Sequence, residues 1–209
     1  MHRFFIKTPW LVKRFFSHYT WNFSRNEPAV YLTFDDGPHP TITPWVLDQL
    51  KTYNARATFF CVGENVARYT DTYNRILAEG HAVGNHTHQH PNGWQTQTEA
   101  YIADVKKSAD YIQSSLFRPP YGRIKKAQAA GVKKVLGAQT KIIMWDVLSC
   151  DFDPAFSKQQ CLQNVVQNAG AGAIIVFHDS EKAALNLMYA LPAVLEHLAR
   201  KKLAFKPIS

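Results

Sequence analysis

Carboxylates, imidazoles and other polar side chains recur in short clusters that each follow an apolar run of this 209-residue chain. The clusters are Thr33-Phe34-Asp35-Asp36-Gly37, His86-Thr87-His88-Gln89-His90, Arg118-Pro119-Pro120-Tyr121-Gly122, Trp145-Asp146 with Asp151, and Val176-Phe177-His178-Asp179. Such residues bind divalent cations and transfer protons, so the set indicates metal-assisted hydrolysis. Clusters this far apart in the sequence can form one site only if the fold brings the strand ends together, as an α/β barrel does.

Two of the histidines, His86 and His90, are four positions apart, the spacing that places two imidazoles on the same side of a helical turn. Two imidazoles and one carboxylate form a common ligand set for a divalent ion that keeps positions open for water and substrate. Zinc is the first candidate, and cobalt, nickel or manganese are alternatives. This segment alone also allows a solvated histidine cluster that binds no metal.

The adjacent carboxylates Asp35 and Asp36 would diverge on an extended backbone, because successive side chains of a strand point to opposite faces. Gly37-Pro38 predicts a turn that could let both carboxylates serve one site. One of them could then hold a cation while the other accepts a proton. Taken alone, the segment is equally compatible with an acidic turn that has no chemical role.

His178 lies at the end of another apolar run, where it could donate a proton, although a histidine there can also be a purely structural residue.

His39, close behind the paired carboxylates, could border the site. The cysteines Cys61, Cys150 and Cys161 lack CxxC spacing, so they predict neither a disulfide framework nor a thiolate zinc site.

The spacing of apolar residues and the positions of turn-forming and helix-capping residues predict seven strands separated by helices. The strands are expected near residues 30–34, 57–62, 81–84, 116–118, 142–147, 173–177 and 203–206. Helices are expected from Thr43-Pro44, over about 65–79 with Gly80 just past the end, after a Ser157 cap, and over 181–200 with a break or kink at Pro192. This alternation favours an α/β fold: a distorted or incomplete (β/α) barrel of about seven mostly parallel strands.

The length fits a single domain covering residues 1–209. Within it we expect an N-terminal segment, 1–28, packed on the barrel, a core that carries the motifs, 29–180, and a C-terminal helix and strand, 181–209. In the N-terminal segment, Thr8 is expected to cap a short helix that has Pro9 at its first position.

The formal net charge of +8 is spread over short basic pairs on the expected helices, without a basic stripe that alternates with aromatics. This pattern argues against a nucleic-acid surface. The basic and aromatic N-terminus, residues 1–16, has no uninterrupted apolar core for a signal peptide or a membrane span, which predicts a cytoplasmic protein by default. We expect a monomer whose N-terminus closes the underside of the barrel, and weak membrane-surface association through this terminus is the alternative.

The clusters, taken in order, resemble the motifs of polysaccharide deacetylases with a NodB homology domain, carbohydrate esterase family 4. Thr33 to Gly37 is similar to the first motif, His86 to His90 to the second, Arg118 to Tyr121 to the third, and Val176 to His178 to the fifth. The resemblance spans about residues 29–180. It implies a metal-dependent hydrolase that removes N-acetyl groups from amino sugars of a peptidoglycan-like or chitin-like glycan.

The resemblance also implies a role for each matching residue. Asp36, His86 and His90 would bind the metal, while Asp35 would be the general base, held by Arg118. Tyr121 would offer its backbone N–H to the oxyanion, His178 would protonate the leaving amine, and Asp151 would orient His178. The sugar and its acetyl group would be bound by Pro120, Tyr121, Trp145, Phe152 and Val176.

The fourth motif, residues 145–152, departs from the family pattern. Phe152 replaces the usual tryptophan, Leu148 stands where an aspartate is common, and in the fifth motif Val176 replaces leucine. Other substrates are a lipid-linked or cytoplasmic sugar precursor, deacetylated or deformylated, and O-acetyl groups of xylan. The non-enzymatic alternative is a carbohydrate-binding module on the same scaffold.

Overall fold

The computed structural model describes residues 5–209, so the start of the N-terminal segment, residues 1–4, lies outside the described residues. The strands are β1 (Ala29–Asp35), β2 (Thr58–Cys61), β3 (Ala82–Asn85), β4 (Leu116–Phe117), β5 (Lys141–Ile142), β6 (Val147–Leu148), β7 (Ile174–His178) and β8 (Ala204–Phe205). The helices are α1 (Trp10–Phe15), α2 (Ile42–Thr52), α3 (Gly63–Arg68), α4 (Thr70–Ala78), α5 (Thr98–Ala109), the 3₁₀ helix η1 (Pro120–Gly122), α6 (Lys126–Leu136), α7 (Lys158–Val166) and α8 (Ala184–Arg200).

Seven parallel strands form a curled sheet in the order β5-β4-β3-β2-β1-β7-β6, and β8 pairs with the start of β1. The central strand β1 is buried along its whole length, as expected for a parallel strand covered on both faces. Phe34 of β1 stacks on Phe59 of β2 and on Phe177 of β7, with ring centroids 5.0 and 6.1 Å apart. The predicted incomplete barrel in a single α/β domain is confirmed.

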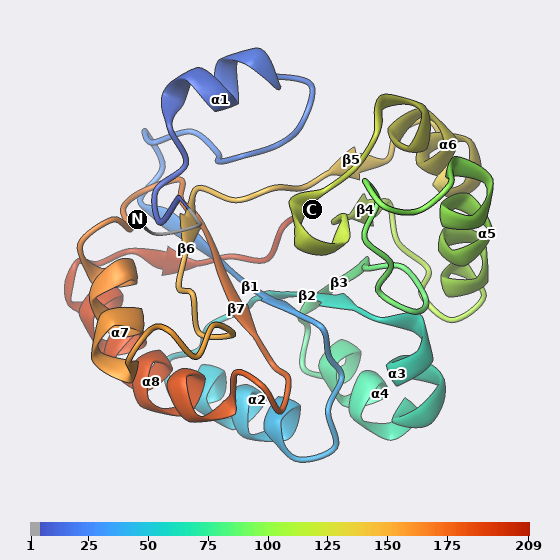
Figure 1. The fold of residues 1–209 in the computed structure, drawn as a ribbon. Helices are drawn as coiled ribbons and strands as arrows, with labels where there is room; N and C mark the ends of the chain where they lie inside the picture. Colours follow the sequence, from blue (N-terminus) through green and yellow to red (C-terminus); the bar gives the residue numbers. More distant parts are fainter. Residues whose placement is uncertain (1–4) are drawn as a thin grey trace.

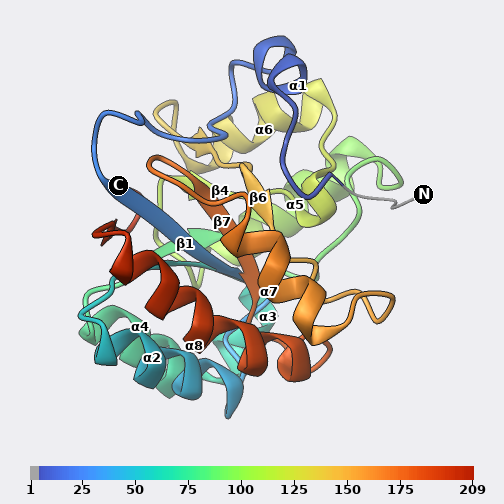
Figure 2. The same cartoon turned by 90° about the vertical axis from the view of Figure 1, so that its left-hand side faces the viewer.

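The helices surround the curled sheet (Figures 1 and 2). Contacts between elements place them in the order α7, α8, α2, α4, α3, α5 and α6 around the outside. The main apolar core lies between this layer and the sheet, and a second cluster joins α5 and α6 to β4 and β5. This arrangement leaves the carboxyl ends of the strands free to carry polar side chains.

Two helix boundaries agree with the predictions. Ser157 caps α7, where its Oγ accepts a hydrogen bond of 3.3 Å from the N–H of Gln160. Gly80 lies just past α4 with a φ of 77°, in the left-handed region that favours glycine after a helix.

Three local expectations were wrong, and of the break or kink expected at Pro192 the break is absent. The expected strand 142–147 is two strands, β5 and β6, at opposite ends of the sheet order. The expected helix 65–79 is divided at Tyr69 into α3 and α4, whereas α8 continues through Pro192 without a break. Pro9, not Thr8, is the N-cap of α1, because the Thr8 hydroxyl donates instead to the carbonyl of Trp145.

Residues 5–28 run past the two edge strands β5 and β6, and α1 lies outside them (Figure 1). Residue 7 forms an antiparallel bridge with Val147 of β6, and residue 20 pairs with Ile143 just after β5. Lys7 and Lys13 both form ion pairs with the buried carboxylate of Asp146. The start of the described chain therefore connects the two edges of the incomplete barrel.

The short helix α1 contains no buried residue, and Trp10, Leu11 and Phe15 are more than half exposed. Membrane-surface association through this part of the chain stays a prediction. Among residues 5–209, no helix is both long enough and apolar enough to cross a bilayer.

Candidate active site

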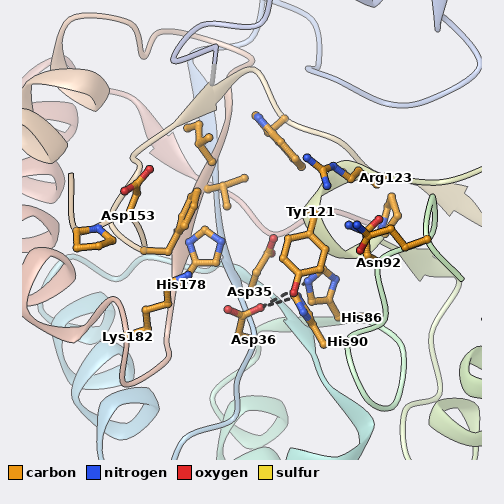
Figure 3. Close-up of a pocket in the computed structure, with 18 residues that line it drawn as sticks. Asp35, Asp36, His86, His90, Asn92, Tyr121, Arg123, Asp153, His178 and Lys182 are labelled. Atoms are coloured by element: carbon orange, nitrogen blue, oxygen red, sulfur yellow. Dashed lines mark ion pairs between the residues drawn. The ribbon is translucent and has the colours of Figure 1, made fainter. Parts of the chain in front are cut away.

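The predicted chemical residues converge at the carboxyl end of the sheet (Figure 3). Asp35 and His178 are the last residues of β1 and β7 and are partners in the register of these strands. His86 directly follows β3, and Arg118 directly follows β4. Adjacent parallel strands thus deliver side chains from four separate segments to one cleft.

Asp36, His86 and His90 form a group whose potential ligand atoms all lie within 4.8 Å of one another. Oδ1 of Asp36 is 3.1 Å from Nε2 of His90 and 3.7 Å from Nε2 of His86. The expectation that a helical turn aligns the two histidines was wrong, since residues 86–90 form an irregular loop. Thr87 and His90 have φ angles of 67° and 56°, and this local geometry brings the rings together.

The histidine loop is held by Thr87 within it and by Asn85 and Asp104, two residues that the sequence did not single out. Asn85 accepts a hydrogen bond from the N–H of Thr87 at 2.8 Å, and Oγ1 of Thr87 accepts one from the N–H of His90 at 3.1 Å. Asp104 of α5 accepts hydrogen bonds from the N–H groups of residues 88 and 89 at 2.6 and 3.1 Å. These contacts stabilise the positive φ angles, which cost energy in residues other than glycine.

His86 is buried, and its Nδ1 lies 2.7 Å from the carbonyl oxygen of Arg118. That contact requires Nδ1 to carry the proton, which leaves the Nε2 lone pair free for a cation. Burial lowers the pKa of His86 to about 4, against the opposing influence of Asp35, so the ring is neutral at pH 7. A neutral imidazole is the form that binds metal.

Asp36 completes the ligand group because its backbone turns away from the strand, with a φ of 81°. Its Oδ1 is buried and has no aligned hydrogen-bond donor among the described residues. A buried carboxylate oxygen without a donor, facing two imidazole nitrogens, fits a divalent cation.

The turn that follows Asp36 is clamped by Asp179. The buried carboxylate of Asp179 accepts hydrogen bonds from the N–H of Gly37, at 3.1 Å, and from the hydroxyl of Thr43. A Cβ at Gly37 would overlap this carboxylate, so only glycine fits there. Burial raises the pKa of Asp179 to about 7 despite these donors. The sequence marked Asp179 only by its position after His178.

Arg118 is completely buried beneath the site. Its NH1 donates to Oδ1 of Asp35 at 2.6 Å and to the Thr33 hydroxyl at 2.7 Å. Nε and NH2 donate to the carbonyls of Ile143 and Met144 at 3.2 and 3.0 Å. These contacts fix the Asp35 carboxylate, while no described residue donates a hydrogen bond to its Oδ2.

His178 is paired with Asp151, as the resemblance implied. Nδ1 of His178 lies 2.8 Å from Oδ1 of Asp151, and the His178 N–H donates to Oδ2 at 2.8 Å. Burial lowers the pKa of His178, but the charge of Asp151 and its hydrogen bond outweigh it and raise the pKa to about 9. The imidazole is therefore protonated at neutral pH and can donate a proton.

The cleft over these groups has a volume of about 720 Å³. It is lined by four of the residues for which the resemblance implies substrate binding, Tyr121, Trp145, Phe152 and Val176, and their binding role stays a prediction. Pro120 is buried and is not a lining residue, whereas its neighbour Pro119 is. The pattern missed several lining residues in connecting segments that have no periodicity: Asn92, Gln95, Arg123, Asp153, Pro154 and Lys182.

The phenolic ring of Tyr121 lies against His90, with ring centroids 4.7 Å apart, and the Phe152 ring lies 4.7 Å from that of His178. The tryptophan expected at position 152 is thus replaced by a smaller aromatic that still contacts the histidine. His39 and Cys150 are not among the lining residues, and burial raises the pKa of the Cys150 thiol to about 12. That shift argues against a thiolate nucleophile.

Residues 23–140 match the sequence model of the polysaccharide deacetylase family, which covers more than half of the chain. The chain belongs to this family. It is 36% identical over 196 residues to a peptidoglycan-N-acetylglucosamine deacetylase of Bacillus cereus, covering 91% of both chains. It is 33% identical to a chitooligosaccharide deacetylase of Azorhizobium caulinodans, covering 75% of this chain and 76% of the relative.

The fold is also similar to that of a solved deacetylase. The crystal structure of the Bc1960 peptidoglycan N-acetylglucosamine deacetylase superimposes with a TM-score of 0.81 at 29% identity, covering 96% of this chain and 95% of the other. Deacetylases of this family are metal-dependent, and Asp36, His86 and His90 form a candidate metal site.

Proposed function

We propose that the protein is a zinc-dependent deacetylase that hydrolyses the N-acetyl group of an amino sugar in a peptidoglycan-like or chitin-like glycan. The observation that carries this proposal is one cleft in which a candidate metal-ligand group and two separately held proton-transfer groups, Asp35 and His178, lie together. The named activities of the relatives support the substrate class. A carbohydrate-binding module would not need this set of ionisable groups.

Asp36, His86 and His90 are the proposed ligands. Two nitrogen donors and one carboxylate oxygen suit zinc and leave room for further ligands. When bound there, the cation supplies positive charge that polarises the acetyl carbonyl and favours ionisation of a water molecule.

Asp35 is the proposed general base. It lines the cleft, and its Oδ1 is occupied by Arg118, so Oδ2 is left to accept a proton from the attacking water. The ion pair holds the carboxylate in one orientation throughout the reaction. Fixed geometry of this kind lowers the barrier, since no reorganisation is needed at the moment of proton transfer.

His178 is the proposed general acid. An amine leaves readily only if its nitrogen gains a proton as the C–N bond breaks, and the Asp151 pair keeps His178 protonated for that purpose. The backbone N–H of Tyr121 is the proposed donor to the oxyanion. Leu148 and Val176 supply apolar surface for the acetyl methyl group.

A substrate screen tests this function directly. Acetate release should be measured on de-peptided peptidoglycan oligomers, chitooligosaccharides and acetylated xylan, with the protein as purified, after a chelator, and after zinc is restored. We expect release from the first two substrates, loss with the chelator and recovery with zinc. Release from xylan alone would change the proposed substrate, and release that is insensitive to the chelator would contradict the metal role.

A further inference from the structure

The cleft continues past the metal ligands along one wall that has no role in the proposed chemistry. Asn92, Gln95 and Arg123 line this wall, and Figure 3 shows Asn92 and Arg123 on the side of the cleft opposite Asp153 and Lys182. Trp94 lies next to Arg123, whose guanidinium is 5.1 Å from the centre of the indole ring. Although Trp94 is a large apolar residue, 61% of it is exposed.

The segment that carries Trp94 is held by hydrogen bonds from the start of α6. The Gln128 side chain donates to the carbonyls of Gly93, at 2.8 Å, and Thr96, at 3.2 Å. The ammonium group of Lys125 also donates to the Thr96 carbonyl, at 2.8 Å. A Cβ at Gly93 would overlap the carbonyl oxygen of Arg123, so the two segments are in close contact. The exposed indole is therefore presented from a fixed backbone.

Arg123 forms no ion pair with a carboxylate within residues 5–209, and the nearby acidic groups are engaged elsewhere. Asp35 is paired with Arg118, and Asp36 faces the histidines. A guanidinium that is half-buried beside an aromatic ring and unpaired can bind a carboxylate through two parallel hydrogen bonds. An exposed indole offers a flat surface for the apolar face of a sugar ring.

We propose that Trp94 and Arg123 form a subsite for a sugar that carries a carboxylate, adjacent to the amino sugar whose acetyl group is removed. The subsite rests on the proposed function and deepens it. It makes the enzyme prefer acidic glycans over neutral ones, with the indole binding the ring and the guanidinium binding the carboxylate.

A pair of substrates that differ only in charge tests this subsite. One is a tetrasaccharide of alternating N-acetylglucosamine and N-acetylmuramic acid with free lactyl carboxylates, and the other is its methyl ester. For the natural protein we expect kcat/KM to be about tenfold higher on the acid, mainly through KM, because a well-formed charged hydrogen-bond pair contributes about that much. Arg123→Gln should bring this ratio close to one.

Three further variants test whether the effect is a local contact: one controls for long-range attraction, and two test the indole. Lys106→Gln removes one positive charge from an exposed position on α5 and should keep the ratio of the natural protein. Trp94→Ala should raise KM several-fold on both substrates, and Trp94→Phe should restore most of the loss. An equal kcat/KM on acid and ester, or a ratio that survives Arg123→Gln, would overturn the subsite.

Failure of the proposed function is distinguishable from failure of the subsite. If no acetate is released from either tetrasaccharide or from chitotetraose, the deacetylase proposal falls. Calorimetric titration of the acid and the ester into the protein then decides the subsite by itself. Tighter binding of the acid that disappears in Arg123→Gln supports it, and equal binding of the two overturns it.

Discussion

The guanidinium of Arg118 donates a hydrogen bond of 2.6 Å to Oδ1 of Asp35, and their side chains are 0% and 5% exposed. Two buried charges are stable in such a place only as a pair, and the same pair orients the proposed base.

Removing the buried cation should destabilise the protein strongly. Arg118→Met leaves the Asp35 carboxylate buried without its partner, so we expect the free energy of unfolding to fall by about 3–5 kcal/mol. Arg200→Met is the matched control, since its ion pair with Glu196 is mostly exposed and should contribute less than about 1 kcal/mol. Urea denaturation of the two variants measures the difference, and equal losses would contradict the importance of the buried pair.

Replacing the proposed base should separate catalysis from metal binding. Asp35→Asn should lower kcat by about two to four orders of magnitude, because the amide cannot accept the proton of the attacking water. The metal content of the protein should remain that of the natural protein. Asp71→Asn, an exposed change in α4, serves as the control, and near-normal activity of Asp35→Asn would remove Asp35 from the role of base.

Replacing a proposed ligand, unlike replacing the proposed base, should remove the bound metal as well as the activity. His90→Ala removes one nitrogen donor from the group of three, so both bound metal and acetate release should be lost. Elemental analysis of the purified protein gives the metal content directly. His18→Ala, an exposed histidine outside the cleft, should leave it unchanged. One equivalent of metal retained in His90→Ala would show that the assignment is wrong.

The His178–Asp151 pair should set the alkaline limit of activity. The pKa of His178 is raised to about 9, so the acid is protonated below that pH and activity should fall as the pH rises through it. In Asp151→Asn the opposing charge is gone and burial then lowers the pKa. The alkaline limb of kcat/KM should therefore move to lower pH, with a larger loss at pH 8 than at pH 6. Profiles with the same alkaline limb would contradict the pairing.

The positions of the proposed catalytic groups were accessible from the sequence because each polar cluster follows a buried apolar run. In a parallel sheet such runs end at one edge, so Asp35 and His178 could be expected to meet although 143 positions separate them in the chain. The pairing of Arg118 with Asp35 and that of His178 with Asp151 were predicted only through the family resemblance. No spacing rule connects residues on different strands.

Other features could not be obtained from periodicity. The segment 142–147 reads as one strand, and nothing in it reveals that its two ends pair at opposite edges of the sheet. The histidine loop depends on left-handed backbone at Thr87 and His90, which residues other than glycine adopt only when surrounding contacts such as those of Asp104 impose it. Arg123 lies in an irregular segment, where no pattern marks which side chains face a cleft.

The pairing of the N-terminal segment with both edges of the sheet has a practical consequence for anyone preparing shorter forms of this protein. A version that starts at residue 23, where the family match begins, would lose the bridges at residues 7 and 20. The edge strands β5 and β6 would then expose unpaired backbone amide groups. Neighbouring molecules could then pair through these exposed edge strands. Poor solubility of such a fragment would reflect the loss of the N-terminal segment and would carry no information about the chemistry of the cleft.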